Sequence, residues 1–189
     1  MGVVSIDIPR SLYEEARRRG INVEDLILDV LISKLKLDPK GAAEARLELA
    51  GKYLREAREY LRRGDPTQAS EKMYRVVEEC IKVLAQIRNT PEHRQAFEEG
   101  RWWTQLLGKA ARRLAKELSE PKIADTWSRA YDIHVWGFHE GRYSIEDITE
   151  DMEYVEWLLN YVKQVVRCQP QHTSRADTHT TNHHEGDRS

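Results

Sequence analysis

Apolar residues recur at intervals of three and four positions along most of the chain from residue 39 to residue 168. This spacing predicts a succession of amphipathic helices. The link between residues 42–64 and 67–88 is so short that these two helices should pack antiparallel as a hairpin. Their inward lines are predicted to be Leu47, Ala50, Leu54, Ala57 and Leu61, and then Met73, Val76, Val77, Cys80, Ile81 and Leu84. Little sequence remains for sheet, so we predict a mainly α fold, an antiparallel four-helix-type bundle.

The predicted helices have recognisable boundaries. Starts are expected where an N-cap residue precedes a proline, at Asp38-Pro39, Asp65-Pro66 and Thr90-Pro91. Ends are expected at Gly64, Gly100 and Gly141. A third bundle helix spans residues 102–120 with Leu106, Leu107, Ala110, Leu114 and Leu118 facing inward. Helix resumes after Pro121 and runs to Gly141, and Ser144 with Asp147 caps a last helix to residue 168.

Residues 1–37 follow a different pattern. Residues 3–8 alternate apolar and polar and stop at Pro9, which predicts one short strand. Ser11 with Glu14 predicts a capping box for a helix that ends at Gly20, and Asn22 with Asp25 starts a second helix. A lone strand needs a pairing partner, and a second copy of the chain can supply it. We therefore predict a strand-helix-helix dimerisation element at residues 1–37, before a bundle at 38–168.

Composition narrows the classes of protein. The 189 residues carry a net charge of −2, which argues against a strongly basic nucleic-acid binder. No apolar run approaches a membrane span, and the two cysteines suggest a cytoplasmic protein without a disulfide framework. Residues 169–189 are polar and should be disordered. Their four histidines, His172, His179, His183 and His184, are not expected to form a metal site, and no cofactor is predicted.

The stretch RAYDIHVWGFHEG, residues 129–141, holds the candidate chemistry. On a regular helix His134 shares a face with aromatic rings, so it is either a core histidine or a functional one. Arg129 and His134 are separated by about 140° round the helix. A bend at Gly137, or a second copy of the chain, would be needed to bring such a pair together.

Residues 40–165 resemble the HEPN superfamily of nucleotide-binding helical bundles, in which nuclease members carry an arginine followed after four to six residues by a histidine. Arg129-Ala-Tyr-Asp-Ile-His134 has this spacing, although many active members have a polar residue where this chain has Ala130. GDPTQASEKMYRVVEECIKVLA and HVWGFHEG resemble more closely the first group of the archaeal PaREP family, usually treated as a branch of HEPN.

This resemblance implies metal-independent RNA cleavage at a dimer interface. His134 would transfer protons and Arg129 would hold the phosphate. Tyr131 and His139 would orient the substrate or a second proton path, and Asp132 would fix a histidine tautomer. Arg101 and Trp102 form a further candidate RNA contact, although paired tryptophans also serve as packing anchors. Two alternatives stay open: binding of RNA or nucleotides without cleavage, and a structural or antitoxin-like interaction protein.

Residues 3–37 also resemble the ribbon-helix-helix start of small antitoxin repressors, which implies DNA binding by paired strands. The outward strand residues would be Ser5 and Asp7, and an aspartate facing phosphates is unfavourable. We therefore interpret this segment first as a dimerisation element and only second as a DNA-binding one.

Overall fold

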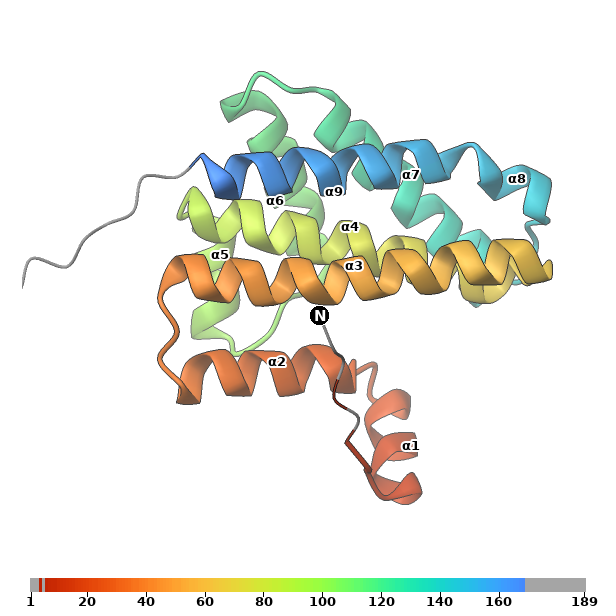
Figure 1. Ribbon diagram of the computed structural model, residues 1–189, viewed down its shortest axis with the longest axis horizontal. Helices are drawn as coiled ribbons and strands as arrows, with labels where there is room; N and C mark the ends of the chain where they lie inside the picture. The colour runs from red at the N-terminus through yellow and green to blue at the C-terminus, as the bar shows by residue number, and fades with distance from the viewer. Residues whose placement is uncertain (1–3, 5, 169–189) are drawn as a thin grey trace, which may run out of the picture.

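The computed structural model describes residue 4 and residues 6–168, and every regular element in this part of the chain is a helix (Figure 1). The predicted mainly α class is therefore confirmed. The elements in chain order are α1 (Arg10–Arg18), α2 (Val23–Lys34), α3 (Pro39–Arg63), α4 (Pro66–Ile87), α5 (Pro91–Glu98), α6 (Thr104–Glu117), α7 (Lys122–Ile133), the π-helix η1 (His134–His139), α8 (Ile145–Thr149) and α9 (Asp151–Arg167).

Helix α4 lies at the centre of the helical body. It forms the predicted antiparallel hairpin with α3 and also contacts α5, α6, α7, η1, α8 and α9. Figure 1 shows α3, α4 and α9 running side by side. The predicted inward residues of α3, α4 and α6 are buried, except Leu61 and Leu118, which are half-buried. Seven further elements thus pack round α4, so the body has more helices than a simple four-helix bundle.

The predicted helix boundaries depend on local chemistry and are mostly confirmed. Asp38, Asp65 and Thr90 each accept a hydrogen bond from the backbone N–H three residues later. Gly64 ends α3 with a left-handed backbone, φ 71°. The predicted helix at 144–168 is divided into α8 and α9, and Ser144 with Asp147 forms the expected capping box.

The predicted strand at residues 3–8 is wrong for the residues that the structure describes. Val4 and residues 6–8 have no regular secondary structure, and residues 3 and 5 lie outside the described part. A strand requires a neighbour for its N–H and C=O groups, and a single copy of the chain provides none. The Ser11 capping box is also wrong, because α1 begins earlier, at Arg10, and the Glu14 carboxylate binds the Arg10 guanidinium instead.

Helices α1 and α2 contain no buried residue. Figure 1 shows α2 beside α3, with α1 turned away from the body. The attachment of α2 is largely ionic and polar: the Glu24 carboxylate accepts from the Tyr53 hydroxyl at 2.7 Å and pairs with Lys52, while Asp25 and Asp29 pair with Arg46. Apolar burial therefore contributes little to the position of this element.

Lys82 is the most buried cation, with 1% of its side chain exposed. Its Nζ lies 2.6 Å from Asp25 Oδ2, 3.1 Å from Glu78 Oε1 and 3.0 Å from Glu79 Oε1. These three carboxylates are close enough together to hold a metal ion, but the Lys82 ammonium lies among them. Burial opposes ionisation of Asp25, yet Lys82 and Arg46 outweigh it and lower its pKa to about 2.

Other predictions about the chain are settled only in part. Cys80 is fully buried, as expected, and no helix in the described ranges combines the length and apolar content needed to cross a bilayer. The expected disordered tail, with its histidines, lies outside the described residues. The division into residues 1–37, 38–168 and 169–189 stays a prediction.

Replacing Lys82 with methionine should lower the free energy of unfolding by about 3–5 kcal/mol, because the buried Glu78 and Glu79 and the half-buried Asp25 would lose the cation that they share. Denaturant unfolding followed by circular dichroism measures this change. The difference in the free energy of unfolding between the parent and Lys82→Met should become smaller as the pH is lowered from about 7 to about 4. Carboxylates without a cation have a raised pKa in the folded state, so protonation favours folding as the pH falls.

Arg63→Met is the matched control, because Arg63 pairs with Glu59 on the exposed side of α3. It should leave stability nearly unchanged. An equally small effect of Lys82→Met would contradict the structural role assigned to the buried ammonium.

Candidate active site

The candidate site is formed where α7 widens into η1. The Glu140 N–H donates to the Val135 carbonyl at 2.9 Å, an i to i+5 hydrogen bond that a regular α-helix does not make. Gly137 lies in this wide turn against Ser70 of α4, and a Cβ at Gly137 would stand 2.2 Å from Ser70 Oγ. The absence of a side chain at Gly137 therefore lets η1 approach α4 closely.

The wide turn brings His134 and His139 together. Their Nε2 atoms are 3.1 Å apart, and the two rings meet nearly edge to face at 76°. Regular α-helical geometry separates residues i and i+5 by about 140°. A regular helix would therefore place these two rings on different faces, and the π-helical turn brings them together because it changes the angle per residue.

His134 is fixed by residues of α4. Its ring stacks on Tyr74 with centroids 3.9 Å apart, and its Nδ1 lies 3.0 Å from Glu71 Oε2. This is ion-pair distance, but the two atoms are not aligned as a hydrogen bond. Glu71 in turn accepts from Arg75 Nε at 2.9 Å. Only 13% of the His134 side chain is exposed, so the ring has one orientation toward His139.

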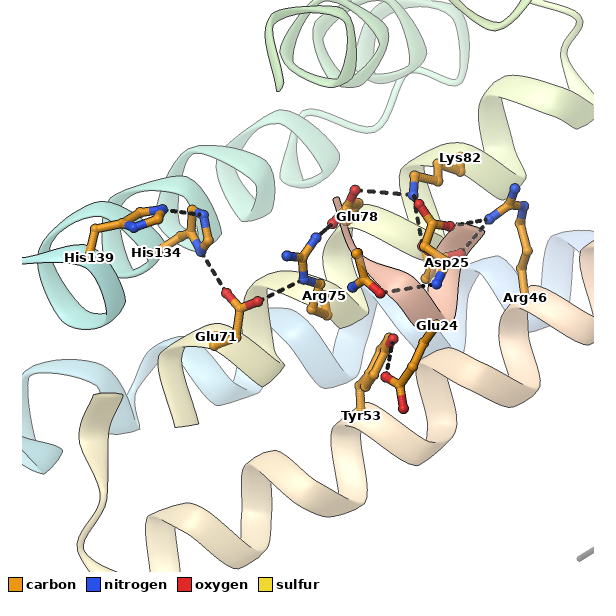
Figure 2. Close-up of polar contacts among 12 residues, drawn as sticks. Glu24, Asp25, Arg46, Tyr53, Glu71, Arg75, Glu78, Lys82, His134 and His139 are labelled. Atoms are coloured by element: carbon orange, nitrogen blue, oxygen red, sulfur yellow. Dashed lines mark hydrogen bonds and ion pairs between the residues drawn. The ribbon is translucent and has the colours of Figure 1, made fainter. Parts of the chain in front are cut away.

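Figure 2 shows that this contact belongs to a longer row of charges. Glu71 and Arg75 are followed on the same helix by Glu78 and Lys82, and each member pairs with the next. Lys82 then reaches Asp25 of α2. The histidine pair is therefore connected through consecutive ion pairs to the N-terminal element.

The pair has the electrostatics of a proton-transfer site. Burial lowers the pKa of His139, and the neighbouring His134 lowers it further. Burial opposes ionisation of Glu71, but His134 and Arg75 outweigh it and lower its pKa. When both imidazoles are neutral, one Nε2 donates to the other across the 3.1 Å contact. Two imidazoles at this distance can pass a proton from one ring to the other.

Arg129 occupies different surroundings. Its Nη1 donates to Asp151 Oδ1 at 2.7 Å, and its guanidinium lies over the Tyr154 ring at 4.2 Å. The cleft round it contains further carboxylates, those of Asp125, Asp132, Asp147 and Glu150. Among the described residues Arg129 makes no contact with His134, so a single copy does not assemble the predicted arginine-histidine pair.

Asp132 and Tyr131, two further residues predicted for the site, lie apart from the histidine pair. Asp132 accepts from the Tyr143 hydroxyl at 2.6 Å and lines the cleft of Arg129, and its predicted role in fixing a histidine tautomer stays a prediction. The carboxylate beside His134 is that of Glu71, whose Oε2 lies 3.0 Å from His134 Nδ1. Tyr131 is 44% exposed and stacks on Trp127 with centroids 6.3 Å apart.

The Arg101-Trp102 pair lies before α6, outside the site. Trp102 is half-buried against the hydrophobic core, as a packing anchor would be. Arg101 stacks on the neighbouring Trp103, with its guanidinium carbon 3.5 Å from the ring centroid. Trp103 is also held by Glu99, which accepts from its indole Nε1–H at 2.7 Å.

Sequence reasoning missed Glu71, Tyr74 and Arg75, although one signal for them was present. Glu71, Arg75, Glu78 and Lys82 recur at steps of three and four along a helix whose other positions are largely apolar. Charges in that pattern share one helix face and can form a ladder of ion pairs. The pattern does not reveal that the ladder is buried or that a histidine from another helix joins it.

The body is an all-helical domain built round α4, and its sequence matches the model of one archaeal family. The sequence profile described as the archaeal PaREP1/PaREP8 family matches residues 45–159. This match covers more than half of the chain, so the chain belongs to the PaREP1/PaREP8 family.

Two solved structures are similar in both sequence and fold. A crystal structure of a protein from Sulfolobus solfataricus is 33% identical with a TM-score of 0.57, over 61% of this chain and 93% of that one. The solution structure of the Orf c02003 protein is 31% identical with a TM-score of 0.56, over 66% of this chain and 95% of that one. No curated protein is significantly similar.

Gly137→Ala should lower the free energy of unfolding by about 1–3 kcal/mol, because the added methyl group overlaps Ser70. Gly51→Ala is the matched control, since its Cβ would meet only Arg55 Nη1 at 3.7 Å. It should slightly increase stability through helix propensity. Thermal unfolding of both variants measures the difference, and equal stability would contradict the close approach of η1 to α4.

Proposed function

We propose that this protein is a HEPN-like RNA-binding protein that cleaves RNA as a dimer without a metal ion, with His134 and His139 as its acid-base pair. The observation that carries the proposal is the 3.1 Å approach of the two Nε2 atoms, with Glu71 behind one of the rings. Two imidazoles of this kind are the groups that such a reaction needs near neutral pH.

The reaction requires one proton acceptor and one proton donor. The ribose 2′-oxygen attacks the adjacent phosphorus while its proton passes to a neutral imidazole. The bond from phosphorus to the 5′-oxygen breaks, and that oxygen receives a proton from the other imidazole. We assign the acceptor role to His139, whose pKa is lowered by burial and by His134, and the donor role to His134, whose Nδ1 lies 3.0 Å from Glu71 Oε2. The products are a 2′,3′-cyclic phosphate and a free 5′-hydroxyl.

We propose that Arg129 acts on the substrate from the other side of a dimer interface. Because it pairs with Asp151 in its own chain, we place it opposite the histidine pair of the second copy. An incoming phosphate would compete with Asp151 for the guanidinium and stabilise the charge of the transition state. The exposed ring of Tyr131 offers a base a surface for stacking.

Residues 1–37 are our proposed dimerisation element. The apolar side chains of Leu26, Val30, Leu31 and Leu35 are between 47% and 65% exposed, and residues 6–8 before α1 form no regular secondary structure in one copy. A second copy of the chain could cover these apolar side chains and pair with the backbone of the segment before α1. DNA binding by the same segment is a weaker proposal, because Asp7 would face the phosphates.

One observation favours a second candidate function, a non-catalytic antitoxin-like interaction protein. His134 is held against Tyr74 and stacks on Phe138 with centroids 5.5 Å apart, as a purely structural histidine would be. In that case His134→Ala would cost stability of about 1–3 kcal/mol and change no activity.

The purified protein should cleave single-stranded RNA in the presence of EDTA and leave cyclic phosphate ends. His134→Ala and His139→Ala should each reduce the rate by about 100-fold or more, because each removes a proton-transfer group. The rate should fall as the pH drops through the pKa of His139, since a protonated imidazole cannot accept the 2′-hydroxyl proton. Gel electrophoresis of labelled RNA measures all of these effects.

His93→Ala is the matched control, because His93 is a half-buried histidine of α5 that contacts Trp102 and no residue of the pair. It should retain the parental rate. Absence of cleavage by the parent across varied RNA sequences, or full activity of both site variants, would refute the catalytic role.

Light scattering should find a dimer for the parent protein, and Leu26→Glu with Val30→Glu should shift it to the monomer. Two carboxylates on the exposed apolar side of α2 would prevent a second copy from burying it. Phe97→Glu is the control, because Phe97 is 81% exposed but lies on α5. A dimer that survives the α2 changes would show that another surface forms the interface.

A further inference from the structure

The solvent side of α6 is unusually cationic. Lys109 and Lys116 lie three or four positions from each of the adjacent residues Arg112 and Arg113, and all four fall within an arc of about 100°. We call these four residues the cationic face. The opposite side of α6 is buried in the body. The only carboxylate of the whole helix is that of Glu117, its last residue.

Most of the cationic face is not neutralised by the protein. The four side chains line an open pocket together with two carboxylates, Glu92 and Glu117. Arg113 binds Glu92, with Nε 3.1 and 3.0 Å from the two carboxylate oxygens. For Lys109, Arg112 and Lys116 the described residues supply no ion pair. Three cations therefore remain available at one surface of a chain whose net charge is −2.

The exposed arginines toward the end of α3 differ from the cationic face in having acidic partners. On α3 the Arg58 guanidinium pairs with Glu156, and those of Arg62 and Arg63 pair with Glu59. Neighbouring like charges at i, i+3 and i+4 on one helix repel each other. The cationic face is thus unfavourable for the helix alone, and an anion that binds there would relieve the repulsion.

The chemistry of the cationic face favours binding of a phosphodiester chain over binding of a membrane. The described chain exposes no large apolar side chain between Trp103 and Tyr131, so α6 offers nothing that would insert into lipid. Ammonium and guanidinium groups bind phosphate oxygens, and the span from Lys109 to Lys116 is about 10 Å along the axis. A flexible chain of regularly spaced phosphates can contact all of them.

The start of α6 is close to the histidine pair. Thr104, the first residue of α6, neighbours the hydroxyl of Tyr74, and the Tyr74 ring stacks on His134. We propose that the cationic face binds the phosphate backbone of single-stranded RNA and holds the strand whose scissile bond reaches the histidine pair. This inference rests on the proposed function, because it identifies the surface that would bind the substrate of that site.

The test measures binding without cleavage. A fluorescent single-stranded oligonucleotide of about 12 nucleotides, with 2′-O-methyl riboses that cannot attack, is titrated with the full chain. Lys109→Gln/Arg112→Gln/Lys116→Gln should weaken binding at least about tenfold and reduce the slope of log K against log salt by about 2. The matched control Arg58→Gln/Arg62→Gln/Arg63→Gln removes the same charge from α3 and should bind like the parent. Both variants should be checked by thermal unfolding.

The outcomes separate this inference from the proposed catalysis. Cleavage of a dinucleotide, too short to span α6, should be the same in the parent and the α6 variant, whereas cleavage of long RNA should fall. Equal binding by the parent and the α6 variant, or equal weakening by both triple variants, would overturn the inference whatever the histidine variants do. Binding to anionic phospholipid vesicles in place of the oligonucleotide would overturn it as well.

Discussion

The buried ammonium of Lys82 is the interaction on which the rest of the structure depends. A charge can be buried only if opposite charges accompany it, and Lys82 has Glu78 and Glu79 on its own helix and Asp25 on α2. Arg46 of α3 joins the same cluster through Glu79 and Asp25. The relative positions of α2, α3 and α4 are therefore linked by the requirement that these charges remain paired.

The same row of charges ends at the candidate site. Arg75 pairs with both Glu78 and Glu71, so the carboxylate behind His134 is held in place by the row. The wide turn of η1 then brings His139 to the exposed side of that ring. Stability and site geometry thus depend on one helix, α4, since it supplies the packing surface, the ion pairs and the orientation of the histidine.

The surface of the body is divided by charge. Carboxylates surround Arg129 in one cleft, whereas α6 exposes cations with few acidic partners. In the function that we propose, α6 attracts the phosphate chain and the histidine pair performs the proton transfers. Arg129 would contribute only where a second copy of the chain meets the first, because in one copy it lies apart from the histidine pair.

The sequence by itself determined the mainly helical class, the α3–α4 hairpin, most boundaries and most of the inward residues. These follow from apolar spacing and from local capping groups such as Asp38 and Asp65, whose effects act within one turn. Only the tertiary structure decided that Glu71 and Tyr74 hold His134, that His139 joins it and that Arg129 pairs with Asp151. These contacts depend on which helices become neighbours and on the close fit of Gly137 against Ser70, which helical periodicity does not encode.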